Sequence, residues 1–392
     1  MNVPKLRFKG FQDAWIKTNF ENAKIQIIDG DRGENYPKSE DFYANGFCLF
    51  LNAGNVTKQG FNFENMQFIS KEKNSSLRKG KLIRDDLVIT TRGTVGNVAY
   101  FNHDVPFEHI RINSGMVIVR SHEDFSRIFI YQFLKSSIFD NWLARHVFGS
   151  AQPQLTVKLL KSLGFTYPKL EEQTKIASFL SAVDDKIACL VKEHELWQQY
   201  KQGMMQQLFS QTLRFQDDDG QDFPEWEEDF LGSFCQIKTG KLDANAMQPN
   251  GQYRFYTCAK EYSFIDNYAF DTEALLISGN GAHVGYIHYY KGKFNAYQRT
   301  YVLDNWVHNI IYIKFFLERF LKERIFSEKK EGNTPYIVLS TLSEMLLKIP
   351  CLEEQTKIAA CLSAIDAKID SVAQQLEQAR VWKQGLLQQM FV

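Results

Sequence analysis

Residues 168–190 read PKLEEQTKIASFLSAVDDKIACL, and residues 350–372 read PCLEEQTKIAACLSAIDAKIDSV. The match continues to the end of the chain, so residues 168–210 and 350–392 align without a gap at an offset of 182. Of these 43 aligned positions, 22 are identical. A match of this length indicates an internal duplication, which has to be recognised before any fold is assigned.

Each copy of the repeat has the hydrophobic spacing of a long helix that packs along a partner. Apolar residues alternate in steps of four and three over about five heptads, the pattern of a coiled coil. Pro168 and Pro350 precede acidic pairs that favour the positive end of a helix dipole. The predicted seam positions are Ile176, Leu180, Val183, Ile187, Leu190, His194, Trp197, Lys201, Met204 and Leu208 in the first copy, and Ile358, Leu362, Ile365, Ile369, Val372, Leu376, Ala379, Lys383, Leu386 and Met390 in the second.

Lys201 and Lys383 interrupt the two seams at the same heptad position, where a polar residue fixes register or partner choice. Two helices of matched length in one chain favour an intramolecular pair. The alternative is that each helix packs only on its own domain. Gly203 and Gly385 are poor helix formers, and we expect a kink or a close helix approach at them.

The duplication extends upstream of the repeat. A glycine-rich turn occurs in each half, TRGTVGNV at residues 91–98 and SGNGAHVG at residues 278–285, and both halves open with LRF, at Leu6 and Leu213. We therefore expect two variable domains, each followed by a repeated helix. The predicted boundaries are 1–166 and 212–348 for the domains, and 167–211 and 349–392 for the helices.

Each variable segment is predicted to be a mixed α+β domain. β-Rich stretches such as DLVITTRGTVGNVAYF alternate with loops in the first half, as ALLISGN and TYVLDN do in the second. An aromatic-rich helix is expected to follow in each half, at residues 126–148 and 308–327.

Polar side chains near the glycine turns are candidates for reading DNA, because base edges are read by Arg, Asn, Gln, Ser and Thr and glycine lets the backbone approach a ligand. Cations of LRKGKLIR suit phosphate contacts. Each residue singly has the alternative of an ordinary turn residue or surface ion pair. Arg111 and Arg299 follow the turns at similar distances, so equivalent roles are expected. The candidates are Arg78, Lys79, Lys81, Arg92, Thr94, Arg111, Asn113, Ser114, Gln152 and Gln154 in the first half, and Asn280, His283, Gln298 and Arg299 in the second.

The amino-acid composition narrows the class of protein, but the net charge gives no support to a nucleic-acid partner. The 46 Lys and Arg balance 46 Asp and Glu, so positioned cations or a basic partner must neutralise any bound phosphate. The six cysteines are scattered, as suits a reducing cytoplasm. We expect no signal peptide at Met1–Gly10, and no apolar run reaches the roughly 20 residues needed to cross a membrane. It also lacks a Walker A motif, a methyltransferase tetrapeptide and a metal-ligand cluster, so no catalytic centre, cofactor or metal is expected.

In its repeated helices and the segments between them, the chain resembles the specificity (HsdS) subunits of type I restriction–modification enzymes. Two variable domains each followed by a P-x-LEEQ helix are typical of that family, and ITTRGTVGNVAYF, INSGMVIV, AQPQLTVKLLKSL and GNGAHVGYIHYYKGKFNAYQRTYVL are similar to its target-recognition motifs. The resemblance implies two α+β target-recognition domains and two long helices that pair as an antiparallel coiled coil with pseudo-twofold symmetry.

The resemblance also implies how such a chain works. Each domain would read one part of a bipartite DNA site, and the helices would set the gap. The helices would dock two methyltransferase (HsdM) subunits that carry S-adenosylmethionine, and restriction (HsdR) subunits would supply the steps that need ATP and Mg²⁺. The alternatives are an enzyme with an unrecognised site, a coiled-coil adaptor without DNA specificity, and a specificity subunit that serves methylation alone.

Overall fold

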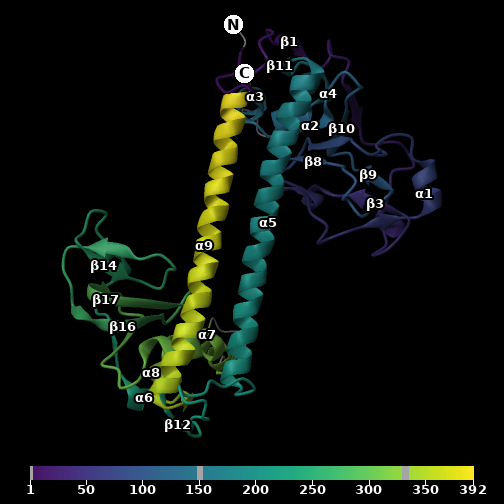
Figure 1. Cartoon of the computed structure of the whole chain (residues 1–392). Coiled ribbons are helices and arrows are strands. Elements are labelled where there is room, and N and C mark those ends of the chain that lie inside the picture. Colours follow the sequence, from purple (N-terminus) through teal and green to yellow (C-terminus); the bar gives the residue numbers. More distant parts are fainter. Residues whose placement is uncertain (1–2, 148–152, 329–334) are drawn as a thin grey trace. The chain divides into compact units, whose positions relative to one another are not determined.

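The computed structural model describes residues 3–147, 153–328 and 335–392. The chain forms two compact units, and the first of them is built from two separate stretches of sequence (Figure 1). The first unit comprises residues 1–191 and 374–392, and the second comprises residues 192–373. Each unit therefore holds one globular domain and parts of two long helices.

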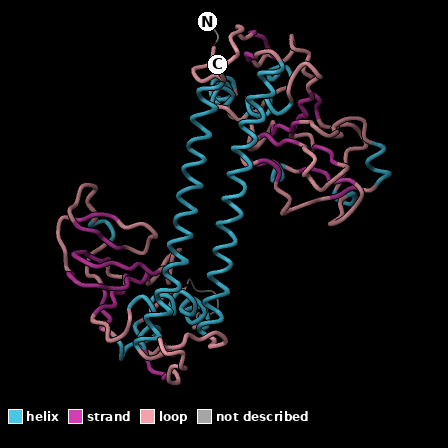
Figure 2. Tube along the Cα trace, in the orientation of Figure 1, coloured by secondary structure: helices cyan, strands magenta, loops and turns pink. Residues whose placement is uncertain are grey.

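The first domain precedes the long helix α5(Leu170–Phe209), and its strands are short and separated by loops (Figure 2). β1 pairs with β11, and the order β2-β10-β7-β8 forms an antiparallel sheet. A further sheet has the order β6-β3-β9, with β3 parallel to β9. The elements are β1(Ile16–Asn19), β2(Gln26–Asp29), η1(Ser39–Asp41), β3(Cys48–Leu51), η2(Ala53–Asn55), β4(Val56–Thr57), β5(Gly60–Phe61), β6(Phe68–Ile69), α1(Lys71–Ser76), β7(Leu87–Thr90), β8(Val98–Tyr100), β9(Ile110–Ile112), β10(Met116–Arg120), α2(Arg127–Leu134), α3(Ser137–His146), α4(Val157–Lys161) and β11(Gly164–Tyr167).

In the sequence, the second domain follows α5 and precedes the long helix α9(Leu352–Met390). Its sheet has the order β13-β18-β16-β17-β14-β15, with β14 parallel to β17 and the other pairs antiparallel. The elements are β12(Glu227–Phe230), α6(Leu231–Phe234), β13(Gln236–Thr239), η3(Ala244–Ala246), β14(Tyr253–Tyr256), β15(Ser263–Ile265), β16(Phe270–Ser278), β17(Ile287–Ala296), β18(Thr300–Asp304), α7(Ile310–Ser327), α8(Leu339–Ser343) and β19(Leu346–Ile349).

Central strands in both domains are buried on two faces, so they read as continuous apolar runs. In β10, Val117 and Val119 join the core that contains α2, whereas Met116 and Ile118 join the core against the β3 sheet. The strand β16 alternates in the same way between two cores. Full burial of each such side chain contributes roughly 1.5–3 kcal/mol, so these strands anchor the loops at their ends.

The helix predicted at residues 126–148 is broken in the structure. It forms α2 and α3, with the break at Lys135 and Ser136, where the buried Ser136 hydroxyl donates to the Phe133 carbonyl at 2.6 Å. A serine that bonds the local backbone competes with helix continuation. The corresponding helix of the second domain, α7, is unbroken.

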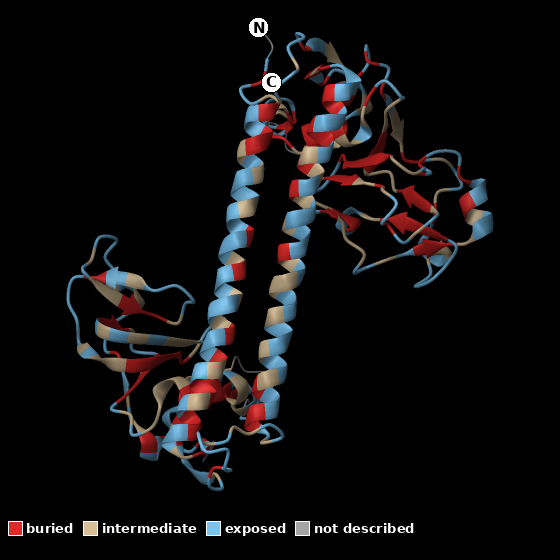
Figure 3. Cartoon of the chain, viewed as in Figure 1, coloured by how far each residue is buried: buried red, intermediate tan, exposed pale blue. Residues whose placement is uncertain are grey.

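Every predicted seam position along both long helices is buried or half-buried, and Figure 3 shows buried and half-buried residues recurring along both helices. In the first unit, Ile176 and Leu180 near the start of α5 share a core with Leu386 and Met390 near the end of α9. In the second unit, residues near the end of α5, such as Leu208, share a core with the start of α9. Within each unit the helices therefore run antiparallel, as expected.

The two seam lysines form equivalent bridges. Lys201 on α5 pairs with Asp366 on α9 at 2.7 Å and with Glu318 on α7 at 3.1 Å. Lys383 on α9 pairs with Asp184 on α5, and Gln132 on α2 donates to the same aspartate at 2.8 Å. Each bridge thus ties both long helices to a helix of the local domain, which specifies register.

Gly203 and Gly385 do not mark the close approach expected from the sequence. An added Cβ would meet no atom within 4 Å at either position, and both lie inside continuous helix. Their presence has no packing reason in the structure.

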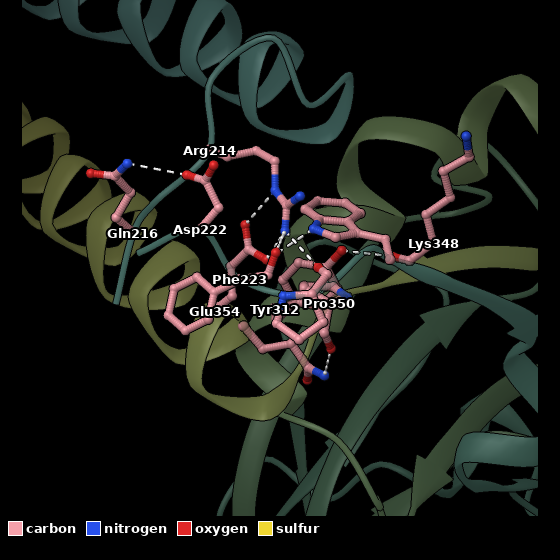
Figure 4. Close-up of polar contacts among 11 residues, drawn as sticks. Arg214, Gln216, Asp222, Phe223, Tyr312, Lys348, Pro350 and Glu354 are labelled. Carbon is pink, nitrogen blue, oxygen red and sulfur yellow. Dashed lines mark hydrogen bonds and ion pairs between the residues drawn. The ribbon is translucent and has the colours of Figure 1, made fainter. Parts of the chain in front are cut away.

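The repeated EEQ motif is explained by a buried polar clamp at the start of each long helix, and Figure 4 shows the one at α9. Arg214 of the second LRF segment donates to both carboxylate oxygens of Glu354, at 3.2 and 2.9 Å, and Trp226 Nε1 donates to Oε2 at 3.0 Å. In the first unit Arg7 donates to both oxygens of Glu172 at 2.7 Å. Both glutamates are almost fully buried.

The glutamine beside each buried glutamate joins the helix to its domain. The Gln355 side chain accepts from the Asn309 N–H at 2.9 Å and donates to the Pro350 carbonyl at 2.8 Å. Gln173 makes the same pair of bonds to Ser126 and to Pro168, at 3.0 and 2.9 Å. Since Ser126 and Asn309 are the N-caps of α2 and α7, each glutamine links the starts of two helices.

We expect Arg214→Met to lower the free energy of unfolding by about 3–5 kcal/mol, because it leaves a buried carboxylate without its charge partner. Thermal unfolding of the whole chain measures this. The double variant Arg214→Met/Glu354→Gln should regain most of the loss. A double variant no more stable than Arg214→Met would show that the arginine does not act by balancing the carboxylate.

Candidate nucleic-acid interface

In the first domain, three loops meet at one end of the β7–β10 sheet. The Thr91 N–H donates to the Gly115 carbonyl at 2.7 Å, and the Leu155 N–H donates to the Thr91 carbonyl at 3.1 Å. The turn between β7 and β8 has Gly93 and Gly96 at φ 71° and 94°, a conformation that favours glycine. These bonds bring together the predicted residues Arg92, Thr94 and Gln154, which are exposed, and Asn113 and Ser114, which are half-buried.

The second domain builds the same arrangement from different residues. The Gly279 N–H donates to the Arg299 carbonyl at 2.9 Å, and the Ile337 N–H donates to the Gly279 carbonyl at 2.8 Å. Gly281 and Gly285 both have φ of 80°. The turn thus brings the predicted residues together: Arg299 and Gln298 are exposed, and Asn280 and His283 are half-buried. The Gln298 side chain donates to Asp243 at 2.8 Å.

Arg111 does not have the placement expected of a base-reading residue, because it is only 5% exposed. Its guanidinium donates to Asn74 and to the carbonyls of Leu77 and Lys79, and burial lowers its pKa. The expected equivalence with Arg299 is also unsupported, since the hydrogen bonds place Arg299 in the position of Gly115. Arg111 is a structural residue of its loop.

The remaining candidates that the structure describes lie on the surface of the first domain. Arg78, Lys79 and Lys81 are exposed on the loop between α1 and β7. Gln152 lies outside the described residues.

Sequence reasoning missed Arg254 on β14 of the second domain. Its guanidinium lies between the rings of Tyr262 and Tyr290, with its carbon 4.3 and 4.4 Å from their centroids, and Nη1 donates to the Tyr256 hydroxyl at 3.3 Å. Tyr262 is partly exposed. Stacking on two rings holds the guanidinium in one orientation. The alternation in YRFY places Arg254 and Tyr256 on one face of the strand, but sequence alone does not show that this face is accessible.

The described residues contain no group of three or more His, Cys, Asp or Glu side chains that could hold a metal ion. Among the described helices, none is both long and apolar enough to cross a membrane.

Comparison with known proteins decides the family. The model of the type I restriction modification DNA specificity domain matches this chain twice, at residues 18–195 and 224–380. The chain belongs to the type I restriction–modification specificity-subunit family. Its two globular domains are therefore DNA specificity domains. Specificity subunits are the non-catalytic components of these systems, and the catalytic activities lie in other subunits.

Relatives of this specificity-subunit chain span bacteria and archaea. It is 40% identical to the type I restriction enzyme EcoDI specificity subunit of Escherichia coli over 155 residues, 39% of this chain and about a third (34%) of that protein. It is 23% identical to the MjaIX specificity subunit of Methanocaldococcus jannaschii over 299 residues, 67% of each chain. It is 22% identical to the EcoprrI specificity subunit of Escherichia coli over 350 residues, covering 86% of this chain and 84% of that one.

Solved structures support the fold of this specificity subunit. The type I restriction–modification S subunit of M. genitalium has a TM-score of 0.65 at 18% identity and covers 100% of this chain and 99% of its own. A chain from a study of complex assembly and conformational transition in the type I R-M system has a TM-score of 0.57 at 16% identity, and covers 95% of this chain and 96% of its own.

We expect Arg299→Ala to weaken recognition of one DNA half-site by about 1–3 kcal/mol if the side chain reads a base. Stability should change by less than about 0.5 kcal/mol, because the side chain is exposed and the turn uses only its carbonyl. Competition binding with duplexes altered in each half-site measures the effect, with Lys17→Ala, an exposed cation on β1, as the control. An equal loss on all sequences would indicate a phosphate contact instead.

Proposed function

We propose that this chain sets the DNA sequence specificity of a type I restriction–modification enzyme by reading a bipartite target, one part with each specificity domain. The observation that carries the proposal is the loop cluster found in each domain. Equivalent backbone hydrogen bonds build the two clusters, so their frames are alike, but the exposed side chains differ.

The difference in side chains suits the reading of two different sequences. Arg92, Thr94 and Gln154 present one set of donors and acceptors in the first domain. Asn280 and Arg299 belong to the set in the second. Arg, Asn and Gln make the two-point contacts to guanine and adenine that distinguish base pairs in the major groove. A shared frame with exchanged side chains therefore changes the sequence that is read without changing the fold.

The long helices would act as a spacer and as a docking surface in this proposal. Two methyltransferase subunits would bind them and bring S-adenosylmethionine to adenines in the target. Restriction subunits, joined through the complex, would supply ATP-dependent cleavage. Joint binding by several subunits also accounts for the absence of a net positive charge, because the partners would neutralise part of the phosphate backbone. The chain would then work in the cytoplasm, beside the DNA.

The experiment is to co-express this chain with a cognate methyltransferase subunit and to map adenine methylation across the host genome. A two-part motif with a fixed gap, absent when the chain is omitted, is the expected result. No new methylation from a well-expressed complex would contradict the proposal and favour a coiled-coil adaptor. Whether added restriction subunits cleave unmodified DNA then separates restriction from methylation alone.

Helix length should determine the gap. Removing residues 190–196 and 372–378 takes one heptad from each helix, which keeps the seam in phase and leaves the Lys201–Asp366 and Lys383–Asp184 bridges in place. Each helix becomes about 10 Å shorter, so the preferred gap should shorten by about three base pairs or the native site should no longer be recognised. Insertion of a heptad at both places should have the opposite effect. An unchanged motif in both variants would exclude the spacer role.

A further inference from the structure

We infer that residues 74–81 of the first domain form a pre-shaped cationic loop for the DNA phosphate backbone, and that buried Arg111 and Asp31 are its positioning residues. The inference rests on the proposed function, because it specifies how one domain holds DNA while its turn cluster reads the bases.

Arg111 donates hydrogen bonds to several acceptors of this loop. Its Nε donates to Asn74 Oδ1 at 2.7 Å, Nη1 donates to the Lys79 carbonyl at 2.6 Å, and Nη2 donates to the carbonyls of Asn74 and Leu77 at 2.8 and 3.1 Å. A single guanidinium therefore fixes both ends of the segment from Asn74 to Lys79. Charge-assisted hydrogen bonds of this kind are about twice as strong as neutral ones.

Asp31 accepts hydrogen bonds from backbone N–H groups of the same loop. Its carboxylate accepts from the N–H groups of Arg78 at 2.6 Å and Lys79 at 3.2 Å, and from Gly33 at 2.8 Å. The carboxyl is 6% exposed, and the Gly33 N–H, with those of Arg78 and Lys79, lowers its pKa against the opposing effect of burial. The backbone of the loop is thus held by an anion through its donors and by a cation through its acceptors.

The side chains that this frame presents are exposed cations, and the charge of Arg78 also helps to lower the pKa of Asp31. Arg78, Lys79 and Lys81 are all exposed, and within residues 3–147, 153–328 and 335–392 none of their side chains is in an ion pair. Gly80 sits between them at φ 82°, and an added Cβ would lie 3.1 Å from Ile112. Three unpaired cations on a backbone that is already ordered can bind phosphates with little further loss of conformational entropy.

The second domain has no matching clamp at this place. Arg111 pairs across the parallel strands with Phe50, and the residue in the same position of the second sheet is Asn295, which pairs with Phe255. Asn295 donates to Asn267 at 2.9 Å and carries no charge. The first domain should therefore contribute a phosphate anchor that the second domain lacks.

The test measures how DNA affinity of the complex with its methyltransferase subunits depends on salt. Each phosphate neutralised adds about 0.9 to the slope of log K against log salt. The double variant Arg78→Ala/Lys79→Ala should lower that slope by about 1.8, so that between 50 and 200 mM salt it loses about tenfold less affinity than the wild type. Its preference for the target over altered half-sites should be unchanged. Lys9→Ala/Lys17→Ala, at exposed cations elsewhere in the first domain, is the matched control and should leave the slope unchanged.

A double-mutant cycle tests the positioning role. Arg111→Lys keeps the charge but loses the planar fork, so the slope should fall as it does in Arg78→Ala/Lys79→Ala, and combining the two changes should add little. Asp31→Asn is a second positioning variant if Arg111→Lys fails to fold. An unchanged slope in the loop variant, or a loss confined to particular bases of one half-site, would overturn the inference. If the wild-type complex itself shows no sequence preference, the proposed function fails instead.

Discussion

A carboxylate removed from water at the start of each long helix is the constraint on which the rest of the architecture depends. Burial of a charge costs several kcal/mol unless a partner offsets it. Glu172 and Glu354 are 1% and 0% exposed, so each requires the arginine of an LRF segment. The segment at the start of each domain must therefore contact the start of the long helix that follows that domain. The glutamine next to the buried glutamate then joins this long helix to α2 or α7. Each domain and the start of its helix are held as one body.

This rigid base explains how the two domains can share a frame and differ in chemistry. The strands β7 and β10 and the second half of β16 are buried on both faces, whereas residues such as Arg92 and Thr94 in the first turn are exposed. Substitution of an exposed residue such as Arg92 or Arg299 leaves the core untouched. Recognition can therefore diverge between the domains at little cost in stability, provided that the glycines and backbone hydrogen bonds of each turn remain.

Features that depend on periodicity could be predicted from the sequence, and features that depend on three-dimensional equivalence could not. The seam is visible in the chain because each of its positions repeats at helical spacing. The EEQ motif suggested only a favourable helix dipole, since the burial of Glu354 depends on Arg214, 140 residues away. Arg111 was misassigned because the distance from a glycine turn does not determine whether a strand residue points inward.

Loop geometry accounts for the other differences between prediction and structure. Arg299 has Gly115 as its counterpart because the loops before them differ in length, and linear spacing cannot reveal this. Arg254 is half-buried, and its guanidinium is held by stacking on Tyr262 and Tyr290, which come from other parts of the chain. At the break between α2 and α3, the Ser136 hydroxyl donates a hydrogen bond to the backbone. A helical pattern of apolar residues gives no sign of such a local competition.

The bridges Lys201–Asp366 and Lys383–Asp184 have a consequence for how this gene can change over time. In each bridge the lysine is encoded in one copy of the repeat and the aspartate in the other. A substitution at Asp184 can therefore be compensated only in the second copy. Gene conversion, in which the second copy with its Asp366 overwrites the first, would restore the Lys383–Asp184 bridge in a single event. Concerted evolution of the two repeats is thus favoured by the protein itself, and the specificity domains beside them remain free to diverge.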